Sequence, residues 1–251
     1  MSVIKGLTYA IIPARSGSTT IKDKNIQHLA GHPMMAYSIA AAILTPEITR
    51  VIVSTDSEQY ASIAKQYGAE IPFLRPASIS GPYSTDYEFM EHAIKWLDKH
   101  NESLPEYWVH LRPTTPLRNP KLISNALATI KNDESSTSLR SLHKTNMCPF
   151  KWFTKDKGGY LETIRDDMSI DQANGPRQLF PQVYIPNGYV DILKTENILN
   201  NHNLHGDKSI GFEVPEVIDV DYIEEMEELQ NIIRNYSGDV IEWLNCRTNY
   251  V

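Results

Sequence analysis

The sequence has few cysteines, no long apolar run and fewer positive than negative charges. Its two cysteines, Cys148 and Cys246, stand far apart and outside any CxxC pattern. They therefore provide no disulfide framework and favour a reducing compartment. No stretch approaches the roughly 18 consecutive apolar residues of a membrane span, and the first residues lack an apolar run with a small-residue cleavage site. We expect a soluble, cytoplasmic protein with no membrane partner.

The net charge and the length of the chain indicate which partners and how many domains to expect. The 251 residues carry 24 lysines and arginines against 31 acidic residues, a formal net charge of -7. Such a protein repels a nucleic acid unless a local basic patch prevails, so we expect no nucleic-acid partner. With 41% hydrophobic residues, the chain is long enough for one large α/β domain. We find no internal repeat or linker and expect a single domain over residues 1–251.

The first half alternates short β-type segments with helical ones. A helix is expected at residues 33–44, Thr85 and Glu88 form a capping-box pattern, and Asn119 followed by Pro120 is typical of a helix start. This alternation predicts a mainly parallel sheet with helices on both faces. The expected strands are residues 8–13, 50–55, 70–74, 107–111 and 136–142.

The second half is less regular. After about residue 142 the pattern changes, because residues 144–164 are rich in aromatic residues, lysine and turn signals and offer no helix of ordinary length. This composition predicts a hairpin excursion from the main sheet. Strand character returns at residues 188–193 and 209–214, and a helix is expected over residues 223–236.

The first strand ends in a loop of small residues that carries Arg15, Lys22 and Lys24. Strand ends of this kind line the ligand crevice of open α/β sheets. Small residues let backbone amides approach phosphate oxygens, and fixed cations offset the phosphate charge. The loop matches neither GxGxxG nor GxxxxGK[ST], which argues against dinucleotide and Walker-type sites. On composition alone, phosphate binding and a merely basic surface loop are equally good interpretations.

Short motifs with a specific joint order and spacing run from near residue 8 to near residue 233. They are Ala14-Arg15 through Lys24-Asn25, Val53-Ser54-Thr55-Asp56, Arg75-Pro76, Arg112-Pro-Thr-Thr-Pro-Leu-Arg118, Pro176-Arg177-Gln178, Pro186-Asn187-Gly188 and Ile218-Asp219-Val220-Asp221. The set resembles the acylneuraminate cytidylyltransferases, or CMP-sialic acid synthetases, and their relatives acting on legionaminic, pseudaminic and ketodeoxyoctonic acids.

The resemblance implies a fold, a reaction and an assembly. The fold is a Rossmann-like nucleotidyltransferase domain of the α/β class, mainly parallel, with a dimerisation arm within residues 142–180. The reaction transfers CMP from CTP to an acidic nine-carbon sugar of the sialic acid type and releases pyrophosphate, with Mg²⁺ as cofactor. We therefore expect a homodimer whose contacts include Trp152 and Phe153.

The resemblance assigns the triphosphate to the first loop, through Arg15, Ser18, Lys24 and Asn25. Arg15 and Lys24 would also neutralise charge during catalysis. The family usually has a lysine and a glycine after the loop serine, whereas this chain has two threonines at positions 19 and 20. One phosphate-facing cation is therefore missing. This departure leaves open weaker CTP binding, compensation by Lys22, and loss of activity.

The resemblance assigns cytosine recognition to Arg75 and Asp86. An arginine can donate to cytosine O2, and a carboxylate can accept from the exocyclic N4 amine. The family more often has a hydroxyl residue near position 86. Because an acidic residue in a first helical turn is favoured by the helix dipole without any ligand, nucleotide binding and helix stabilisation are equally supported for Asp86.

The sugar site is implied by residues later in the chain. Arg112 stands where the family has a glutamine that faces the acidic sugar, whereas a structural salt bridge is the preferred interpretation of Arg118. Lys151, Arg177 and Asn187 match residues near the active site of the family, although a solvated surface lysine is nearly as well supported for Lys151.

Two further positions depart from the sialic acid members of the family. Ile185 stands where those members have an arginine, and Asp191 stands where they have a tyrosine. We therefore expect a sugar pocket that differs from theirs. The sequence does not identify which acidic sugar is used.

Asp219 and Asp221 are the predicted metal ligands, with Asp221 also assigned to catalysis. In an extended segment alternate side chains share a face, so these two carboxylates project together while Ile218 and Val220 can enter the core. Paired carboxylates suit a hydrated Mg²⁺ that bridges to phosphate oxygens. The competing interpretation is that Asp221 caps the helix beginning near Ile223.

Three other functions compete with this prediction. A nicotinamide-dependent oxidoreductase shares the alternating pattern, but no glycine-rich fingerprint opens the chain. A catalytically weak or silent nucleotide-binding relative is compatible with the threonine at position 19. A cytidylyltransferase for an eight-carbon, ketodeoxyoctonate-type sugar is the third alternative.

Overall fold

The core of the protein is a six-stranded sheet in the order β10-β6-β9-β5-β1-β4. The computed structural model describes residues 2–247. Strand β1 pairs in parallel with β4 and β5, and β10 pairs in parallel with β6, whereas β9 runs antiparallel to both of its neighbours. The mainly parallel α/β sheet is thus confirmed. The strands are β1 (Val3–Pro13), β4 (Arg50–Ser54), β5 (Leu104–His110), β6 (Ser138–Thr145), β9 (Val183–Lys194) and β10 (Ser209–Glu213).

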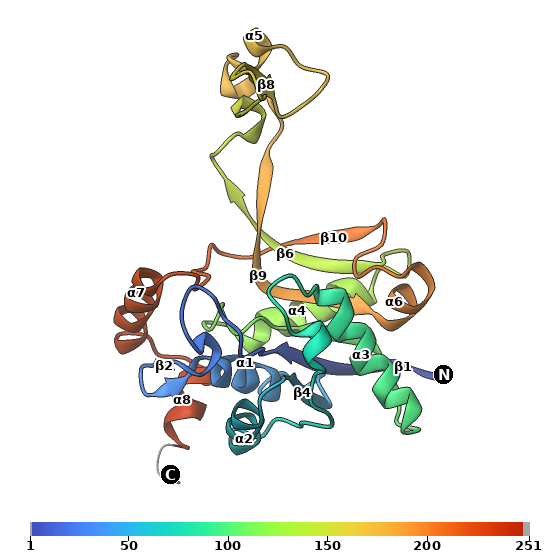
Figure 1. Ribbon diagram of the computed structural model, residues 1–251. Helices are drawn as coiled ribbons and strands as arrows, with labels where there is room; N and C mark the ends of the chain where they lie inside the picture. Colours follow the sequence, from blue (N-terminus) through green and yellow to red (C-terminus); the bar gives the residue numbers. More distant parts are fainter. Residues whose placement is uncertain (1, 248–251) are drawn as a thin grey trace.

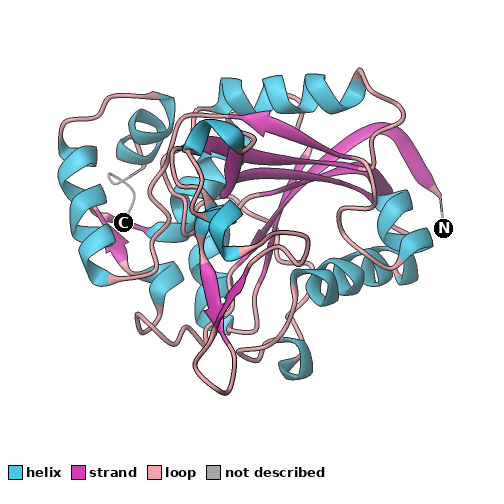
Figure 2. Cartoon of the chain, turned by 90° about the horizontal axis from the view of Figure 1, so that it is seen from above, coloured by secondary structure: helices cyan, strands magenta, loops and turns pink. Residues whose placement is uncertain are grey.

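Helices cover both faces of this sheet (Figures 1 and 2). In β1, Ala10 and Ile12 belong to one buried apolar cluster and Tyr9 and Ile11 to the other, because alternate strand residues point to opposite faces. The first cluster is completed by α1 (Met34–Ile43), α2 (Glu58–Gln66), α4 (Pro120–Lys131), α7 (Ile223–Arg234) and α8 (Asp239–Asn245). The second is completed by α3 (Asp86–Lys99) and α6 (Thr195–Asn201).

Local sequence signals explain where these helices begin. The Thr85 side chain and the Glu88 carboxylate form the predicted capping box at the start of α3. Asn119 accepts a hydrogen bond from the Lys121 amide at the start of α4, with Pro120 in the first turn. Such caps satisfy amide groups that have no partner inside the helix. The predicted helix starts are therefore confirmed.

The strand expected at residues 70–74 is wrong. Only Glu70 forms an isolated bridge, to Ile52 in β4. Pro72 follows two positions later and has no amide hydrogen to continue a ladder. The segment instead leads to Arg75, whose amide donates to Thr55 O at 2.7 Å. Its course places Arg75 beside the carboxyl end of β4.

An arm projects from the sheet between β6 and β9 (Figure 1). The outer ends of these strands pair from Leu142 opposite Pro186 to Thr145 opposite Val183. The tip contains β7 (Phe153–Lys155), β8 (Leu161–Thr163), α5 (Ile170–Ala173) and two short 3-10 turns, Pro149–Lys151 and Arg177–Leu179. The predicted hairpin excursion is confirmed, although its role in dimerisation stays a prediction.

At the root of the arm the pairing of β6 with β9 is interrupted. Arg140 lies opposite Asp191 and Leu142 opposite Pro186, so four residues of β9 face Ser141 alone. Gly188, inside this bulge, has a φ of 64°, which favours glycine, and an added Cβ would lie 3.2 Å from Thr115 Oγ1. The bulge turns the arm away from the sheet beside the segment that follows β5.

The remaining elements are small. A two-residue strand pair, β2 (His28–Leu29) with β3 (His32–Pro33), follows the first loop, and short 3-10 turns cover Lys24–Ile26 and Ala77–Ile79. Among the helices described, none is both long and apolar enough to cross a membrane.

Candidate active site

The loop after β1 is fixed by contacts with the end of β4. The amide and hydroxyl of Ser16 donate to the two carboxylate oxygens of Asp56, at 2.8 and 2.9 Å. Asn25 Nδ2 donates to Arg15 O at 3.0 Å and closes the loop on itself. Arg15 Nη1 is buried, yet it has no hydrogen-bond partner in the described part of the chain. A buried guanidinium nitrogen without an acceptor suits an anionic ligand.

This loop forms one wall of a cavity of about 310 Å³ at the carboxyl ends of the strands. The cavity contains all six predicted nucleotide-binding residues together with Arg112 and Asp221. Its lining residues are Pro13, Arg15, Ser18, Thr19, Thr20, Lys24, Asn25, Arg75, Ser84, Asp86, Phe89, Arg112, Pro113, Thr114 and Asp221. Motifs that are far apart in the sequence, from Arg15 to Asp221, thus converge on one site.

Lys24 and Asp221 form an ion pair on this cavity. Lys24 Nζ lies 2.9 Å from Asp221 Oδ1 and donates to Val220 O at 2.7 Å. The lysine is buried, whereas the Asp221 side chain is 62% exposed. Helix α7 has Tyr222 at its N-cap position, so the interpretation of Asp221 as the cap is wrong. The carboxylate is directed at the predicted phosphate loop instead.

Asp219 lies near the site but does not line the cavity. Val220 is buried and Ile218 is partly buried against the core, while Asp219 and Asp221 are exposed, as the alternation predicted. The Asp219 Oδ2 atom lies 3.9 Å from where a Cβ on Gly188 would be. Among residues 2–247 no group of three or more histidine, cysteine or acidic side chains could hold a metal ion.

Arg75 is held rigidly on the opposite wall. Its Nε donates to Ser54 Oγ at 3.0 Å and its Nη2 to Ser54 O at 2.7 Å. The guanidinium carbon lies 4.7 Å from the centroid of the Phe89 ring. Burial lowers the pKa of Arg75 to about 10, partly offset by Asp56 and Asp86, so the group is charged at neutral pH. The result is a fixed donor next to Ser84 and Asp86.

Arg112 links two carboxylates. Its Nη2 donates to Asp86 Oδ2 at 2.7 Å and its Nη1 to Asp191 Oδ2 at 2.9 Å. Arg140 Nε donates to the other oxygen of Asp191 at 3.3 Å, and His110 Nδ1 lies 4.0 Å from Asp191 Oδ2. Positions 86, 112 and 191 are those at which the resemblance implies uncharged residues in the family. The structure shows that the charge of Arg112 is balanced by the carboxylates of Asp86 and Asp191.

Arg118 is a structural residue, but the predicted salt bridge is wrong. The buried guanidinium donates to the carbonyls of Tyr189, Arg112 and Gly188 and to Ser38 Oγ. In the described part of the chain no carboxylate lies at ion-pair distance from it. Burial lowers the pKa of Arg118 to about 9. The residue ties the segment after β5 to the bulge in β9.

The predicted sugar-binding residues are separated. Asn187 is buried at the root of the arm, where its Nδ2 lies 3.5 Å from His143 Nδ1. Lys151 and Arg177 lie on the arm: Lys151 Nζ donates to Gly175 O at 2.9 Å and Arg177 Nη1 to Phe180 O at 3.1 Å. Within one chain, only Arg112 of the four predicted sugar ligands lines the cavity.

The loop contains no evident replacement for the missing family lysine. Thr19 and Thr20 line the cavity at the expected place. Lys22 is exposed and does not line it. Sequence reasoning also missed His110 and Arg140, which surround Asp191. Arg140 belongs to none of the motifs, so the sequence indicated only that it lies in a predicted strand.

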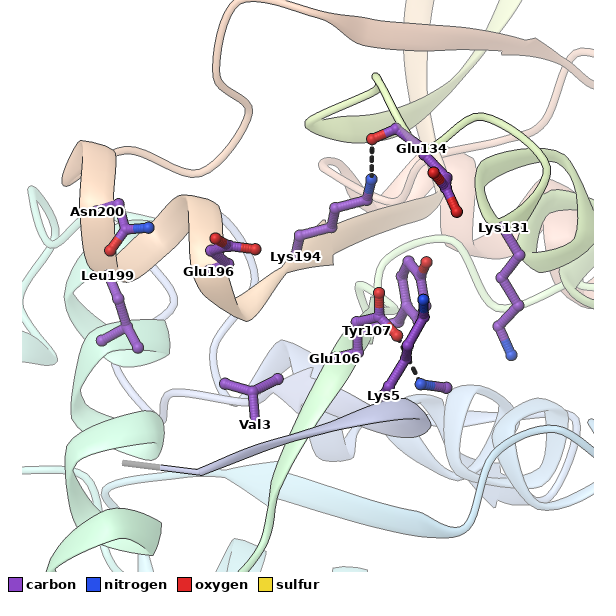
Figure 3. A pocket seen from close by; sticks show the side chains of 11 residues that line it. Val3, Lys5, Glu106, Tyr107, Lys131, Glu134, Lys194, Glu196, Leu199 and Asn200 are labelled. Carbon is purple, nitrogen blue, oxygen red and sulfur yellow. Dashed lines mark hydrogen bonds between the residues drawn. The ribbon is translucent and has the colours of Figure 1, made fainter.

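A larger cavity of about 790 Å³ lies at the other end of β1 and β5 (Figure 3). Three lysines and three glutamates line it, and Lys194 Nζ is 3.5 Å from Glu134 O. None of the motifs reaches this end of the sheet. The cavity therefore belongs to a different part of the molecule from the candidate active site.

Comparison with known proteins identifies the class. The sequence matches the cytidylyltransferase family over residues 9–200, and the chain belongs to this family. A solved structure of CMP:2-keto-3-deoxy-manno-octonic acid synthetase complexed with CTP superposes with a TM-score of 0.65 at 14% identity, covering 91% of this chain and 98% of that chain. This likeness confirms the nucleotidyltransferase fold.

Curated relatives are named for N-acylneuraminate, diacetyllegionaminic acid and pseudaminic acid. The chain is 31% identical to the N-acylneuraminate cytidylyltransferase of Escherichia coli over 81% of its length, but it spans 46% of that relative. It is 29% identical to the CMP-N,N'-diacetyllegionaminic acid synthase of Legionella pneumophila, over 84% of this chain and 90% of that protein. A pseudaminic acid cytidylyltransferase of Campylobacter jejuni is 34% identical over 46% of this chain and 50% of its own length.

Proposed function

We propose that this protein transfers CMP from CTP to an acidic nine-carbon sugar of the sialic acid type, forming the CMP-sugar and pyrophosphate. Family membership and the names of the relatives support this activity. The main structural support for this proposal is one cavity that is lined by Arg15, Lys24 and Arg75. Arg15 Nη1 is buried there and has no hydrogen-bond partner among the described residues. Three cations on a small strand-end cavity suit a nucleoside triphosphate.

The phosphates are assigned to the loop after β1. Arg15 and Lys24 provide the positive charge, while Ser18 and Asn25 line the same wall. The reaction is in-line attack of the sugar hydroxyl on the α-phosphorus, with pyrophosphate as the leaving group. Catalysis of this kind depends chiefly on positioning and on neutralising charge that develops on the phosphate oxygens. The loop after β1, which Asp56 and Asn25 hold in place, is assigned both the positioning of the phosphates and the neutralisation of their charge.

The base is assigned to the opposite wall. Arg75 is buried, charged and fixed by Ser54, so it can donate to cytosine without moving. Asp86 lies on the same wall. We therefore assign the cavity a phosphate side and a base side; Thr114 and Asp221 also line it.

We propose that Asp221 and Asp219 hold Mg²⁺ together with the phosphates. Carboxylate oxygens are hard donors, and magnesium often uses only one or two of them plus water and phosphate oxygens, so the pair fits this ion. Asp221 is on the cavity, next to the phosphate-side lysine. A bound Mg²⁺ would neutralise phosphate charge. Asp219→Asn and Asp221→Asn should each retain the fold and raise the magnesium requirement; wild-type turnover at low magnesium in both would reject this assignment.

The arm is proposed as a dimerisation element. Its exposed apolar side chains include Trp152, Phe153 and Tyr160, which are 51%, 37% and 76% exposed. A second copy that covers them would remove apolar surface from water. In such a homodimer the arm is the part that can bring Lys151 and Arg177 to a sugar in the cavity of the other copy. We assign Arg112 a positional role instead, because both of its terminal nitrogens already bond carboxylates.

The location proposed is the cytoplasm. Cys148 and Cys246 are both free, which is compatible with a reducing compartment.

One assay tests the proposed function. Pyrophosphate release is measured with CTP and Mg²⁺ against several nine-carbon acids and the eight-carbon ketodeoxyoctonate, with UTP and ATP as nucleotide controls. Turnover with a nine-carbon acid supports the proposal, and turnover only with ketodeoxyoctonate moves the substrate to the eight-carbon class. Binding of CTP without turnover on any sugar identifies a silent relative, whereas stabilisation by NAD alone would end the nucleotidyltransferase assignment.

A further inference from the structure

Lys24 and Asp221 pair with each other in the structure, although each is assigned to a different part of the bound substrate. Lys24 is assigned to the phosphates, and Asp221 to the metal ion that accompanies them. Lys24 Nζ lies 2.9 Å from Asp221 Oδ1, and both residues line the cavity. Without a ligand, the ammonium and the carboxylate therefore neutralise each other at the place proposed for the triphosphate.

The backbone on both sides of Asp221 is anchored. Val220 is buried, and its amide donates to Thr114 O at 2.8 Å. On the other side, the amides of Asp221 and Tyr222 donate to Glu225 Oε2 at 2.6 and 2.8 Å. Because the backbone is held while the Asp221 side chain is 62% exposed, the carboxylate can leave the lysine by side-chain rotation alone.

Lys24 has a second contact that does not depend on Asp221. Its Nζ donates to Val220 O at 2.7 Å, and the side chain is 11% exposed. An ammonium has three donors, so it can exchange one acceptor and keep another. When the carboxylate leaves, the donor that it used becomes available to a phosphate oxygen, and the lysine stays in place. The carboxylate becomes available to a cation at the same time.

This exchange is favourable for only one form of the nucleotide. A metal-free triphosphate that takes Lys24 leaves the Asp221 carboxylate without a partner beside the negative phosphates. A triphosphate that carries Mg²⁺ supplies a partner to each group, phosphate oxygens to the ammonium and a cation to the carboxylate. Since a ligand shifts such an equilibrium only by its difference in affinity for the two states, the metal complex opens the pair more readily.

We propose that the Lys24–Asp221 ion pair is a resting lock, which makes the cavity select metal-loaded over metal-free nucleoside triphosphate. The inference rests on the proposed function and on the proposed metal role of Asp221, and it adds the contact that couples the two binding events. Asp219 is proposed for the same ion, but it does not line the cavity, and its Oδ2 lies 3.9 Å from where a Cβ on Gly188 would be. Asp219 therefore provides a control that removes the same charge nearby without opening the lock.

The first test measures CTP binding by calorimetry, with Mg²⁺ and in metal-free buffer, at an ionic strength that screens exposed charges beyond about 8 Å. The wild type should bind CTP at least about 10-fold more weakly without metal. In metal-free buffer, Asp221→Asn should bind CTP about 3- to 10-fold more tightly than the wild type, because Lys24 is no longer paired with a carboxylate. Asp219→Asn should stay within about 2-fold of the wild type under the same conditions.

Three results of this test would overturn the lock while the proposed function stands. They are equal tightening in both aspartate variants, no tightening in Asp221→Asn, and a wild-type affinity for CTP that is the same with and without metal. A wild type that binds CTP under neither condition would overturn the proposed function as well.

The second test approaches the lock from the lysine. Lys24→Met leaves Asp221 without its competing ammonium, so Mn²⁺, which takes the same oxygen ligands as Mg²⁺, should bind about 3- to 10-fold more tightly in the absence of nucleotide. Lys22→Met removes the same charge from an exposed position in the same loop and should leave Mn²⁺ binding within about 2-fold of the wild type. Circular dichroism checks that each variant folds, and the comparison of the two aspartates decides the proposal if Lys24→Met does not. Mn²⁺ binding that is the same in folded Lys24→Met and in the wild type would show that the pair does not mask Asp221.

Discussion

Replacing Lys24 by methionine is the most direct perturbation of the proposed phosphate side. Methionine retains an unbranched chain of similar length and removes only the charged head. Lys24 Nζ donates to Val220 O at 2.7 Å and pairs with Asp221 at 2.9 Å, in a side chain that is 11% exposed. The variant therefore removes one buried charge-assisted hydrogen bond and one partly solvated ion pair.

The expected cost in stability follows from these two contacts. The hydrogen bond from a charged donor is worth about 1.5–3 kcal/mol, and its loss leaves Val220 O without that donor. The ion pair adds less than about 1 kcal/mol, because the Asp221 side chain is 62% exposed and screened by water. We expect the free energy of unfolding to fall by about 2–4 kcal/mol and the urea midpoint to fall by about 1 M.

Activity should fall further than this local loss implies. If Lys24 also contacts the triphosphate, its removal costs a second charge-assisted contact, and kcat/KM should decrease by about 100-fold. Pyrophosphate release and urea denaturation are measured on the same preparations. Lys22→Met is the matched control, because this lysine is in the same loop but exposed and off the cavity. Reduced stability with wild-type kcat/KM would refute the phosphate role and leave Lys24 as a latch for the segment before α7.

Three further predictions concern the loop, the buried histidine and the arm. Thr19→Lys should tighten CTP binding measured by calorimetry by about 10-fold if it adds one charge-assisted phosphate contact; unchanged or weaker binding would show a rebuilt loop. Burial lowers the pKa of His110 to about 4, so its unfolded form binds more protons as pH falls from about 6.5 to 4, and stability should drop by about 3 kcal/mol over that window. His110→Gln should flatten this part of the pH profile in urea denaturation, and an identical profile would contradict the assignment. Sedimentation should show a dimer at micromolar concentration that Trp152→Glu with Phe153→Glu weakens by at least about 10-fold, while a monomeric wild type would reject the arm as a dimer contact.

Those parts of the fold that depend on neighbouring residues were predictable from sequence. The capping box at Thr85 and the Asn119 cap involve residues a few positions apart, so their spacing alone specifies helix starts. The direction of β9 was not predictable in this way, because it depends on pairing with two strands distant in sequence. The strand predicted at residues 70–74 is wrong although its local composition is of the β type. Pro72 has no amide hydrogen and interrupts the ladder after Glu70.

The candidate site, too, was predictable only in part. Strand-end motifs identified which side chains line the cavity, because the carboxyl ends of parallel strands share one edge of a sheet. Which partners those side chains choose was not predictable. Lys24 and Asp221 are 197 positions apart, and Arg112 and Asp191 are 79 apart. No local pattern encodes such pairs, although the alternation of sign at positions 86, 112 and 191 offered a hint.

The departures from the family pattern are of two physical kinds. Arg112 introduces a charge into a partly buried site, which is costly unless carboxylates meet it, and Asp86 and Asp191 do so on either side. With Arg140 the cluster contains two positive and two negative groups, so its net charge is zero. The threonines of the phosphate loop have no such compensation within the cavity. The four charged side chains therefore form one interdependent cluster, and reversing one of the charges alone leaves another without its partner. On the proposed phosphate side, the resemblance implies one cation fewer than the family has, so we expect Lys24 and Arg15 to carry more of the phosphate binding.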